Sequence, residues 1–446
     1  MMIDRDRLFK NFNEQKEYME DKIQLGIESN RKGYARINFA DENGEPVCDV
    51  KIKINQKSHD FKFGCNIFKL KGFATDIHNK LYEEKFKKLF NLAVAPFYWS
   101  KFEPTEGNMR FEKDSEIIDR RPAPELILEF CKENNIEVKG HPLYWAAMVP
   151  DWLPKDYEEM KPYLTRRLKK IAERYDGVIK SFDCVNEVTS VPLLNDEPNK
   201  KSSHYRNFNP LGGDYTEWVF KQADRFFCDS KLIINETGGA WSEFKKEVSP
   251  YYMLIEKLLN KGCRVDTIGL QYHIFLQQDD LYKATVKEYN PKYLYNVMDC
   301  YGGFNKPLCV SEITIPGCGE NGDEIQAETI KNLYRIWFSH KNMESIVYWN
   351  LGDNCAISEG HGWGEDVFKS GLTRSDFSEK PSYKVLDELI NKEWKTNLEL
   401  ECKTDFVNFK GFYGNYELSV IHNGKETKRQ IHLSKTGYDE FTVVCK

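Results

Sequence analysis

The chain has 446 residues, of which 40% are hydrophobic and 14% aromatic, enough apolar material for a large packed core. Its 64 Lys and Arg against 70 Asp and Glu give a net charge of −6, so it lacks the basic excess of proteins that bind nucleic acid or anionic membranes through charge. No apolar run approaches the roughly 18 residues that span a bilayer. Segment 1–22 has no apolar stretch typical of a secretory signal, so we expect a cytoplasmic protein with reduced cysteines. We expect neither nucleic acid nor membrane as a partner, and the oligomeric state stays open.

The N-terminal 60 residues form a separate element in this prediction. Residues 1–31 are typical of a charged helix. Alternating apolar runs at 35–39 and 47–54 flank the turn sequence 41–46, a pattern that indicates a β-hairpin. We therefore expect a helix and a small β-hairpin over residues 1–60.

Residues 61–391 repeat one pattern, in which a short apolar run is followed by a loop and a longer amphipathic segment. Near-continuous apolar strands that alternate with helices are typical of a parallel sheet buried on both faces. Eight such units predict an α/β fold, the (β/α)8 or TIM barrel. A doubly wound sheet is the alternative, but it rarely needs eight evenly spaced units. The apolar runs occupy 61–68, 89–99, 137–145, 181–188, 231–237, 267–275, 307–316 and 345–353.

The pattern changes again over residues 392–446. Polar and apolar residues alternate there with period two, and turn residues stand at Gly411, Asn423-Gly424 and Gly437. This predicts a small C-terminal all-β domain. It is either a structural cap or a carbohydrate-binding module, and the cap is favoured because its cluster of exposed-looking aromatic residues is short.

Polar and aromatic residues stand at the ends of the predicted barrel strands, where (β/α)8 barrels carry their active sites. Burying ionisable groups in a place that favours Val, Ile and Leu costs desolvation energy unless each group has a partner. Several such groups from separate strands therefore favour a functional site over isolated structural charges. The candidates are His141, Trp145, Asn186, Glu187, Asn235, Gln271, His273, Glu312 and Trp349.

Two of these candidates are glutamates on opposite sides of the predicted barrel mouth. Glu187 ends the fourth strand and Glu312 the seventh. Paired carboxylates are what glycoside hydrolysis requires, one to protonate the leaving oxygen and one to attack the anomeric carbon or guide water to it. Tryptophan stacks on sugar rings, while Asn, Gln and His bond to hydroxyls. We therefore expect a glycosidase with a carbohydrate substrate. The sequence shows no metal-ligand spacing, so we expect neither a metal nor a cofactor.

Six segments, in the correct order, resemble glycoside hydrolase family 10, the retaining xylanase family. The segment FDCVNEV at 182–188 is similar to the family's Trp-Asp-Val-Val-Asn-Glu, and VSEI at 310–313 to its Thr-Glu-Leu-Asp. The resemblance implies that Glu187 is the acid/base, that Glu312 is the nucleophile and that Asn186 contacts the sugar 2-hydroxyl. The other similar segments are KGHPLYW at 139–145, TIGLQYHI at 267–274, VYWNLGD at 347–353 and EKPSY at 379–383.

The resemblance also implies roles for the remaining candidates. His141 and Trp145 belong at the subsite of the cleaved sugar, and Trp349 at the eighth strand lines it. His273 is expected to hold Glu312, and Gln271 to line the pocket. Asn235 begins the segment Asn235-Glu236-Thr237, which stands where the family has Asn-Asp-Tyr on the aglycone side.

The chain departs from the family pattern next to these residues. The Glu, Asn and Lys that grip the second sugar on the glycone side are missing from Val94–Trp99, and Ala146–Met148 lacks a Gln that serves the same subsite. The Asp that pairs with the strand-six His reads Thr314. These changes favour a retaining β-glycosidase with altered specificity. The aromatic residues Phe97, Tyr98 and Tyr144 are expected either to line the pocket or to pack the strand ends.

Two further signals are weaker. Gly317–Gly322 matches the dinucleotide fingerprint, but Glu320, Asp323 and Glu324 would oppose a pyrophosphate with like charge, so nucleotide binding is disfavoured. Loop 354–370 carries His361 and Trp363, and it either closes over a sugar or is a surface loop.

The sequence thus supports three hypotheses. The first is a retaining hydrolase of xylan or xylo-oligosaccharides, with the two carboxyl groups about 5–5.5 Å apart. The second is a β-glycosidase for another oligosaccharide or an aryl glycoside. The third is a catalytically inactive carbohydrate-binding barrel, which the altered subsite favours and the presence of both glutamates disfavours.

Overall fold

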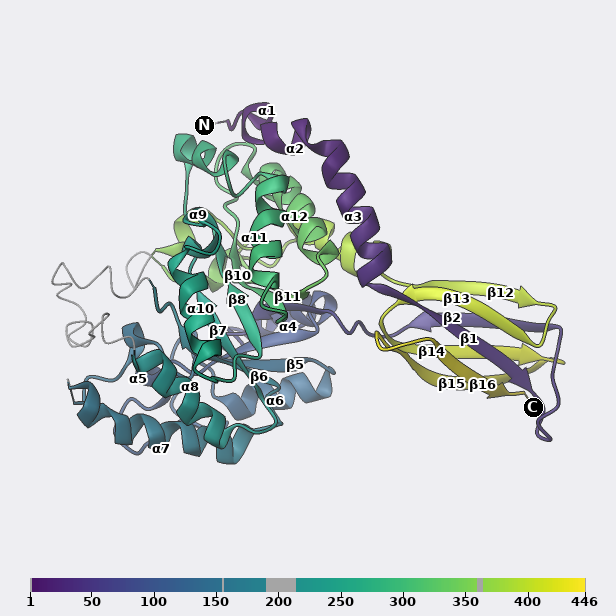
Figure 1. The fold of residues 1–446 in the computed structure, drawn as a ribbon, viewed down its shortest axis with the longest axis horizontal. Coiled ribbons are helices and arrows are strands. Elements are labelled where there is room, and N and C mark those ends of the chain that lie inside the picture. The colour runs from purple at the N-terminus through teal and green to yellow at the C-terminus, as the bar shows by residue number, and fades with distance from the viewer. Residues whose placement is uncertain (1, 155, 190–213, 359–363, 446) are drawn as a thin grey trace.

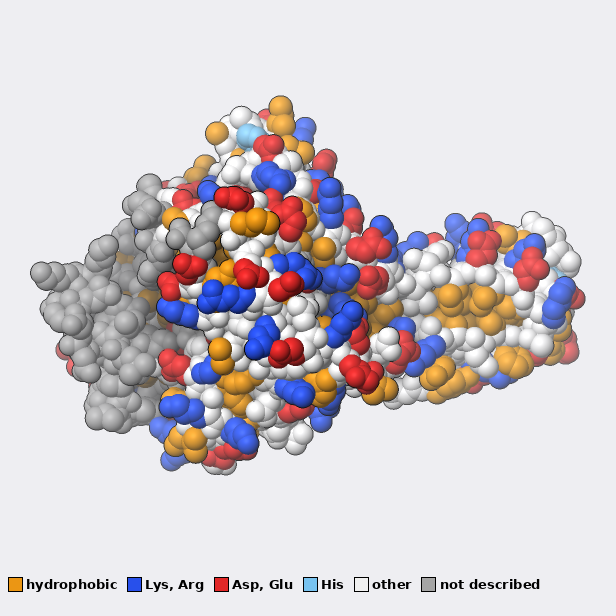
Figure 2. Space-filling model, turned by 90° about the horizontal axis from the view of Figure 1, so that it is seen from above, with side chains coloured by type: hydrophobic (Ala, Val, Ile, Leu, Met, Phe, Trp, Pro, Cys, Tyr) orange, Lys and Arg blue, Asp and Glu red, His pale blue; other side chains and the backbone are white. Residues whose placement is uncertain are grey.

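The computed structural model describes residues 2–154, 156–189, 214–358 and 364–445. It contains a barrel and a β-sandwich (Figure 1). Within the described residues, no helix combines the length and the apolar character needed to cross a bilayer. The face drawn in Figure 2 shows acidic and basic side chains interspersed, without a large area of one sign.

Eight parallel strands form the barrel, which confirms the predicted (β/α)8 fold. The sheet closes because β11 pairs with β10 on one side and with β3 on the other. All residues of β4 and β10 are buried, as expected of strands covered on both faces. The strands are β3 (Lys62–Asn66), β4 (Leu92–Pro96), β5 (Glu137–His141), β6 (Ser181–Asn186), β7 (Lys231–Glu236), β8 (Thr267–Leu270), β10 (Leu308–Thr314) and β11 (Met343–Tyr348), with β9 (Tyr272–His273) as a short addition beside β10.

Helices surround the barrel strands. Four of the long helices begin with Pro, whose fixed φ suits the first turn, at Pro124, Pro250, Pro291 and Pro381. Side-chain caps start others: Thr75 accepts from His78 N at 3.3 Å. The helices are α4 (Asp76–Leu89), α5 (Trp99–Phe102), α6 (Pro124–Glu133), α7 (Tyr157–Tyr175), α8 (Asp214–Phe226), α9 (Gly239–Ser242), α10 (Pro250–Asn260), α11 (Pro291–Gly302), α12 (Gly322–Ser339) and α13 (Pro381–Glu388).

The N-terminal segment folds as three helices where one was predicted. They are α1 (Arg5–Leu8), α2 (Lys10–Glu14) and α3 (Lys16–Asn30), and α3 runs beside α12 (Figure 1). The breaks fall at Phe9 and Gln15, which leave the helical conformation. Phe9 is fully buried against Tyr289, so packing on the barrel, which a helical pattern does not encode, sets the first break.

The predicted N-terminal hairpin is wrong in its pairing. Strand β1 (Lys32–Ala40) pairs with β13 (Phe406–Phe412) and β16 (Asp439–Val444), while β2 (Val50–Gln56) pairs with β12 (Asn397–Cys402) and β14 (Gly414–His422). An isolated bridge joins Ala40 and Pro46. Both strands bury one alternating face, and two facing sheets satisfy that pattern as well as a hairpin does. With β15 (Lys425–Leu433), strands from both ends of the chain therefore form one sandwich.

The sandwich is attached at the N-terminal ends of the barrel strands. Arg31 donates to the carbonyl oxygens of Phe338, of His340 at 2.5 Å and of Met343, the first residue of β11, at 2.8 Å. Trp394 stacks on Phe338 with ring centroids 4.1 Å apart. This position leaves the opposite, C-terminal ends of the barrel strands free of the sandwich (Figure 1).

Candidate active site

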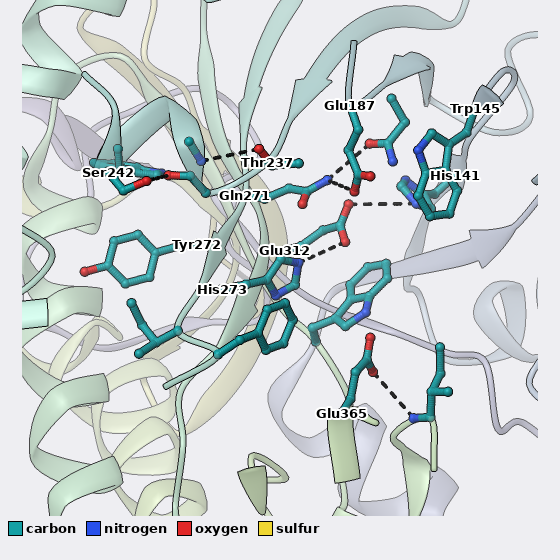
Figure 3. Close-up of a pocket in the computed structure, with 18 of the residues that line it drawn as sticks. His141, Trp145, Glu187, Thr237, Ser242, Gln271, Tyr272, His273, Glu312 and Glu365 are labelled. Carbon is teal, nitrogen blue, oxygen red and sulfur yellow. Dashed lines mark hydrogen bonds and ion pairs between the residues drawn. The ribbon is translucent and has the colours of Figure 1, made fainter. Parts of the chain in front are cut away.

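A cavity of about 430 Å³ opens at the C-terminal ends of the barrel strands. Figure 3 shows side chains from several strands converging on it. Asn235 is the one predicted site residue that does not line it; it is fully buried and bonded to residues that do. The predicted residues that line the cavity are His141, Trp145, Asn186, Glu187, Gln271, His273, Glu312 and Trp349.

Glu187 directly follows β6 in a left-handed conformation, with φ of 57°. A non-glycine residue adopts this conformation only where its surroundings hold it there. Its backbone N–H donates to Asn235 O at 2.8 Å, and its Oε1 accepts from Gln271 Nε2 at 3.0 Å. Burial, reinforced by the charge of Glu312, raises the pKa of Glu187 to about 8. The side chain is therefore a protonated acid at neutral pH.

Glu312, on β10, faces Glu187 across the cavity (Figure 3). Its Oε1 accepts from Asn235 Nδ2 at 2.9 Å and lies 3.8 Å from His141 Nε2. Its Oε2 lies 3.3 Å from His273 Nε2. Nitrogen groups on three other strands thus surround this carboxylate and fix its orientation.

The amides link the two glutamates. Asn186 Oδ1 accepts from Asn235 Nδ2 at 2.8 Å and from Gln271 Nε2 at 3.2 Å. Since Asn235 also bonds to Glu312 and Gln271 also bonds to Glu187, one network runs between the two carboxyl groups. Such a network holds both in a single relative position.

His273 contacts Thr314, one of the positions at which the chain departs from the family pattern. Thr314 stands where the resemblance places an Asp, and its Oγ1 lies 2.8 Å from His273 Nδ1. The Thr314 hydroxyl therefore contacts Nδ1 of His273 in place of an Asp carboxylate and adds no negative charge.

Sequence reasoning missed the support beneath His141. Asp183 Oδ2 lies 2.6 Å from His141 Nδ1 and 2.9 Å from Lys139 Nζ, and all three are buried. Burial opposes ionisation of Asp183, but the Lys139 charge and the His141 hydrogen bond outweigh it and lower the pKa of the carboxyl. The signal was present, because Lys139 and Asp183 are charged residues inside apolar runs on neighbouring strands.

Aromatic rings that follow β4, β5 and β11 form part of the cavity wall. Trp349 lies edge-on to His141 at 5.5 Å between centroids, and Tyr98 lies 5.8 Å from Trp145. Tyr98 thus belongs to the predicted wall. Phe97 and Tyr144 do not line the cavity and pack instead among core aromatic rings.

The same wall carries charges that the sequence did not single out. Arg120, Arg121 and Glu365 line the cavity next to Tyr98, and each is at most 9% exposed. They come from long loops between strands, so reading strand ends alone could not find them. Among the described residues, no group of three or more His, Cys, Asp or Glu could hold a metal ion.

The two weaker sequence signals differ in their relation to the cavity, since loop 354–370 contributes Ile357 and Glu365 to its lining. Gly317–Gly322 leads into α12 and contributes no lining residue to the cavity. His361 and Trp363 lie outside the residues that the structure describes.

Comparison with known proteins agrees with this geometry. The model of glycosyl hydrolase family 10 matches residues 55–388. Native xylanase 10B from Thermotoga maritima superimposes with a TM-score of 0.58 at 22% identity, covering 75% of this chain and 96% of that one. This likeness shows the shared barrel fold.

Two curated relatives match over most of the chain. Anti-sigma-I factor RsgI6 of Acetivibrio thermocellus is 24% identical over 414 residues, which cover 91% of this chain and 47% of that protein. Endo-1,4-beta-xylanase 5-like of Arabidopsis thaliana is 23% identical, covering 89% of this chain and 63% of that protein. The chain thus spans less than two thirds of each. Because the family model matches most of its length, the chain belongs to glycosyl hydrolase family 10.

Proposed function

We propose that the protein is a retaining β-glycosidase of the endo-1,4-β-xylanase type, acting on xylan or xylo-oligosaccharide-like substrates by double displacement. The observation that carries this proposal is the pair of carboxyl groups, the partly buried Glu187 and the buried Glu312, facing each other in one cavity. Their environments differ, since Glu187 is held neutral while Glu312 is surrounded by nitrogen groups. Different environments for two facing carboxyl groups assign the acid and the nucleophile.

In the first step, a Glu312 carboxylate oxygen forms a bond to the anomeric carbon while the bond to the leaving oxygen breaks. Glu187 transfers its proton to that oxygen, so the leaving sugar departs as an alcohol. The raised pKa of Glu187 supplies this proton at neutral pH. A glycosyl ester on Glu312 and an ionised Glu187 remain.

In the second step, Glu187 accepts a proton from water as the water oxygen attacks the anomeric carbon and Glu312 leaves. The charge of Glu312, one cause of the raised pKa of Glu187, is absent while the ester exists. Losing it lowers the pKa of Glu187 and favours the ionised form that the base requires. The product keeps the β configuration.

The other site residues hold the sugar and the nucleophile. We assign His141, Trp145, Asn186 and Trp349 to contacts with the sugar at the cleaved bond, because all four line the cavity beside the glutamates. Gln271 positions Glu187, while Asn235 and His273 position Glu312 through the contacts described above.

A second candidate is a barrel that binds saccharides without cleaving them. The relative named anti-sigma-I factor favours it, since that name describes a regulator. Against it, turnover needs an intact pair of glutamates and a network that holds them, and both are present.

We also propose a cytoplasmic location. Ten of the 12 cysteines are buried or partly buried. Buried cysteine thiols in this number suit a reducing compartment.

The test is chromatographic product analysis over β-linked oligosaccharides and aryl glycosides. Wild type, Glu312→Ala and the exposed sandwich variant Glu401→Gln are compared. We expect xylo-oligosaccharide cleavage by wild type and Glu401→Gln and its loss in Glu312→Ala. Cleavage of another glycoside alone would redirect the substrate assignment, and binding without product from any member would favour the second candidate.

A further inference from the structure

One cation in the cavity wall has no use in the mechanism above. Arg121 lies next to Tyr98, is 9% exposed and faces the cavity shared with Glu187 and Glu312. Its guanidinium carbon lies 4.1 Å from the centre of the Tyr98 ring and 5.1 Å from that of Phe68. The two rings fix the guanidinium in place without neutralising it.

The neighbouring cations of the site have acidic partners. Lys139 bonds to Asp183 at 2.9 Å, and Arg120 Nη2 lies 3.9 Å from Glu365 Oε2. Glu365 is also held by Asn350 Nδ2 at 3.0 Å. Within 4.0 Å, Glu365 therefore pairs with Arg120 and not with Arg121, on which it acts only from a greater distance.

Arg121 itself forms no ion pair within 4.0 Å among the residues that the structure describes. Its Nη1 donates to Arg120 O at 2.7 Å, and its Nε is buried without a hydrogen-bond partner. Burial lowers the pKa of Arg121 to about 10, so the side chain remains a cation at neutral pH. A buried, unpaired guanidinium is costly unless a ligand supplies the missing anion.

We infer that this end of the cavity, formed by Tyr98, Arg120, Arg121 and Glu365, binds the carboxylate of a uronosyl residue in the saccharide, with Arg121 as its counter-ion. The inference rests on the proposed function, since it names the class of saccharide that the same site takes: an acidic oligosaccharide. The segment Val94–Trp99, which lacks the polar side chains implied by the family resemblance, adjoins this end through Tyr98.

The charge inventory favours a singly charged ligand group. Arg121 offers one positive charge without an ion pair within 4.0 Å among the described residues, while Glu312 and Glu365 line the same cavity. A doubly charged phosphate would leave an excess negative charge beside them. A planar carboxylate matches the fork of a guanidinium and needs only one positive charge.

The test is calorimetric titration of the Glu187→Gln protein, which prevents turnover. The ligands are xylotriose, xylotriose with one glucuronosyl branch on its non-reducing xylose, and xylotriose with one sulfate ester at the same place. Each is titrated into proteins that also carry Arg121→Gln, Arg121→Lys or the exposed sandwich substitution Arg429→Gln. Circular dichroism and thermal melting check that each variant folds.

We expect the glucuronosyl ligand to bind at least tenfold more tightly than xylotriose. The ratio should fall to about one in Arg121→Gln, persist in part in Arg121→Lys and remain unchanged in Arg429→Gln. It should also shrink as salt rises. If Arg121→Gln does not fold, the Arg121→Lys and salt results decide, since a purely structural arginine would give no ligand preference in any protein.

Three results would overturn the inference: equal binding of acidic and neutral ligands, a preference that survives Arg121→Gln, or tighter binding of the sulfate ester than of the uronosyl ligand. Failure of the proposed function looks different. A preference for the acidic ligand with no hydrolysis by wild type would contradict the proposed glycosidase activity and still support binding of the carboxylate at Arg121. Hydrolysis without any preference for the acidic ligand would support the glycosidase activity and contradict binding of the carboxylate at Arg121.

Discussion

At the scale of single residues, the site depends on ionisable groups, buried or partly buried, that have different neighbours. Glu187 is kept neutral, Asp183 is kept ionised by Lys139 and His141, and Arg121 has no acidic partner in the described structure. The same low-dielectric surroundings thus produce an acid, a positioning carboxylate and a candidate anion site. Burial is the main cause of the raised pKa of Glu187, whereas its charged neighbours decide the ionisation of Asp183.

Glu187 predicts a particular dependence of stability on pH. Its pKa is raised in the folded state, so its contribution to stability is full below the unfolded value near 4.3 and is lost as pH rises through about 8. We expect the free energy of unfolding to fall between pH 5 and 8 in wild type and to fall less in Glu187→Gln. Urea unfolding of both proteins at the two pH values measures this. Equal slopes would contradict the assignment of the raised pKa.

Asp183 predicts a coupled loss of stability and activity. Asp183→Asn leaves Lys139 buried without its counter-ion, which should cost about 3–5 kcal/mol. It should also lower kcat more than it changes KM, because His141 loses the group that orients it. The double variant Asp183→Asn with Lys139→Met serves as control: it should recover much of the free energy of unfolding while kcat stays low. Recovery of kcat together with stability would reduce Asp183 to a structural role.

At the scale of elements, alternation predicted the strands better than it predicted their partners. Run 35–39 lies within β1 and run 47–54 overlaps β2, which begins at Val50. Each strand needs a buried face, and the two facing sheets of the sandwich supply it. A turn sequence between them was compatible with a hairpin, and only contacts with residues after 396 decided otherwise. By contrast, each barrel strand pairs with neighbours fixed by the repeat itself, so the (β/α)8 fold was predictable.

The sandwich core predicts a sharp contrast along β2. Ile52 is fully buried between the sheets, while Lys51 beside it is exposed. We expect Ile52→Ala to destabilise the sandwich by about 2–5 kcal/mol and Lys51→Ala to change its stability by less than about 0.5 kcal/mol. Denaturant unfolding followed by circular dichroism compares them. Similar effects of both substitutions would show that β2 does not bury the face assigned to it.

At the scale of the whole molecule, the chemistry and the terminal sandwich lie at opposite ends of the barrel. The sandwich meets the start of β11 through Arg31, whereas the glutamates stand at the strand ends. This arrangement agrees better with a structural cap than with a module that presents substrate to the site. The predicted site residues could be found because each lies near the carboxyl end of a strand. The arginines could not, since long loops bring them to the cavity.

Arg31 predicts that this junction supports the fold without touching catalysis. Arg31→Met removes the donor for three buried carbonyl oxygens, and each unsatisfied group costs about 1–3 kcal/mol. We expect a lower melting temperature with KM and kcat unchanged at temperatures where the variant is folded. A change in KM for oligosaccharides would instead connect the sandwich to substrate binding.

The central claim is that Glu312 becomes covalently bound to the sugar, while Glu187 first donates a proton to the leaving oxygen and then accepts one from water. It is tested most directly by incubating the protein with an activated 2-deoxy-2-fluoro-β-xylobioside and mapping the adduct by peptide mass spectrometry. We predict one fluoroglycosyl group, on Glu312, formed in step with loss of activity. An adduct on another residue, or continued turnover with no adduct, would contradict the proposed mechanism.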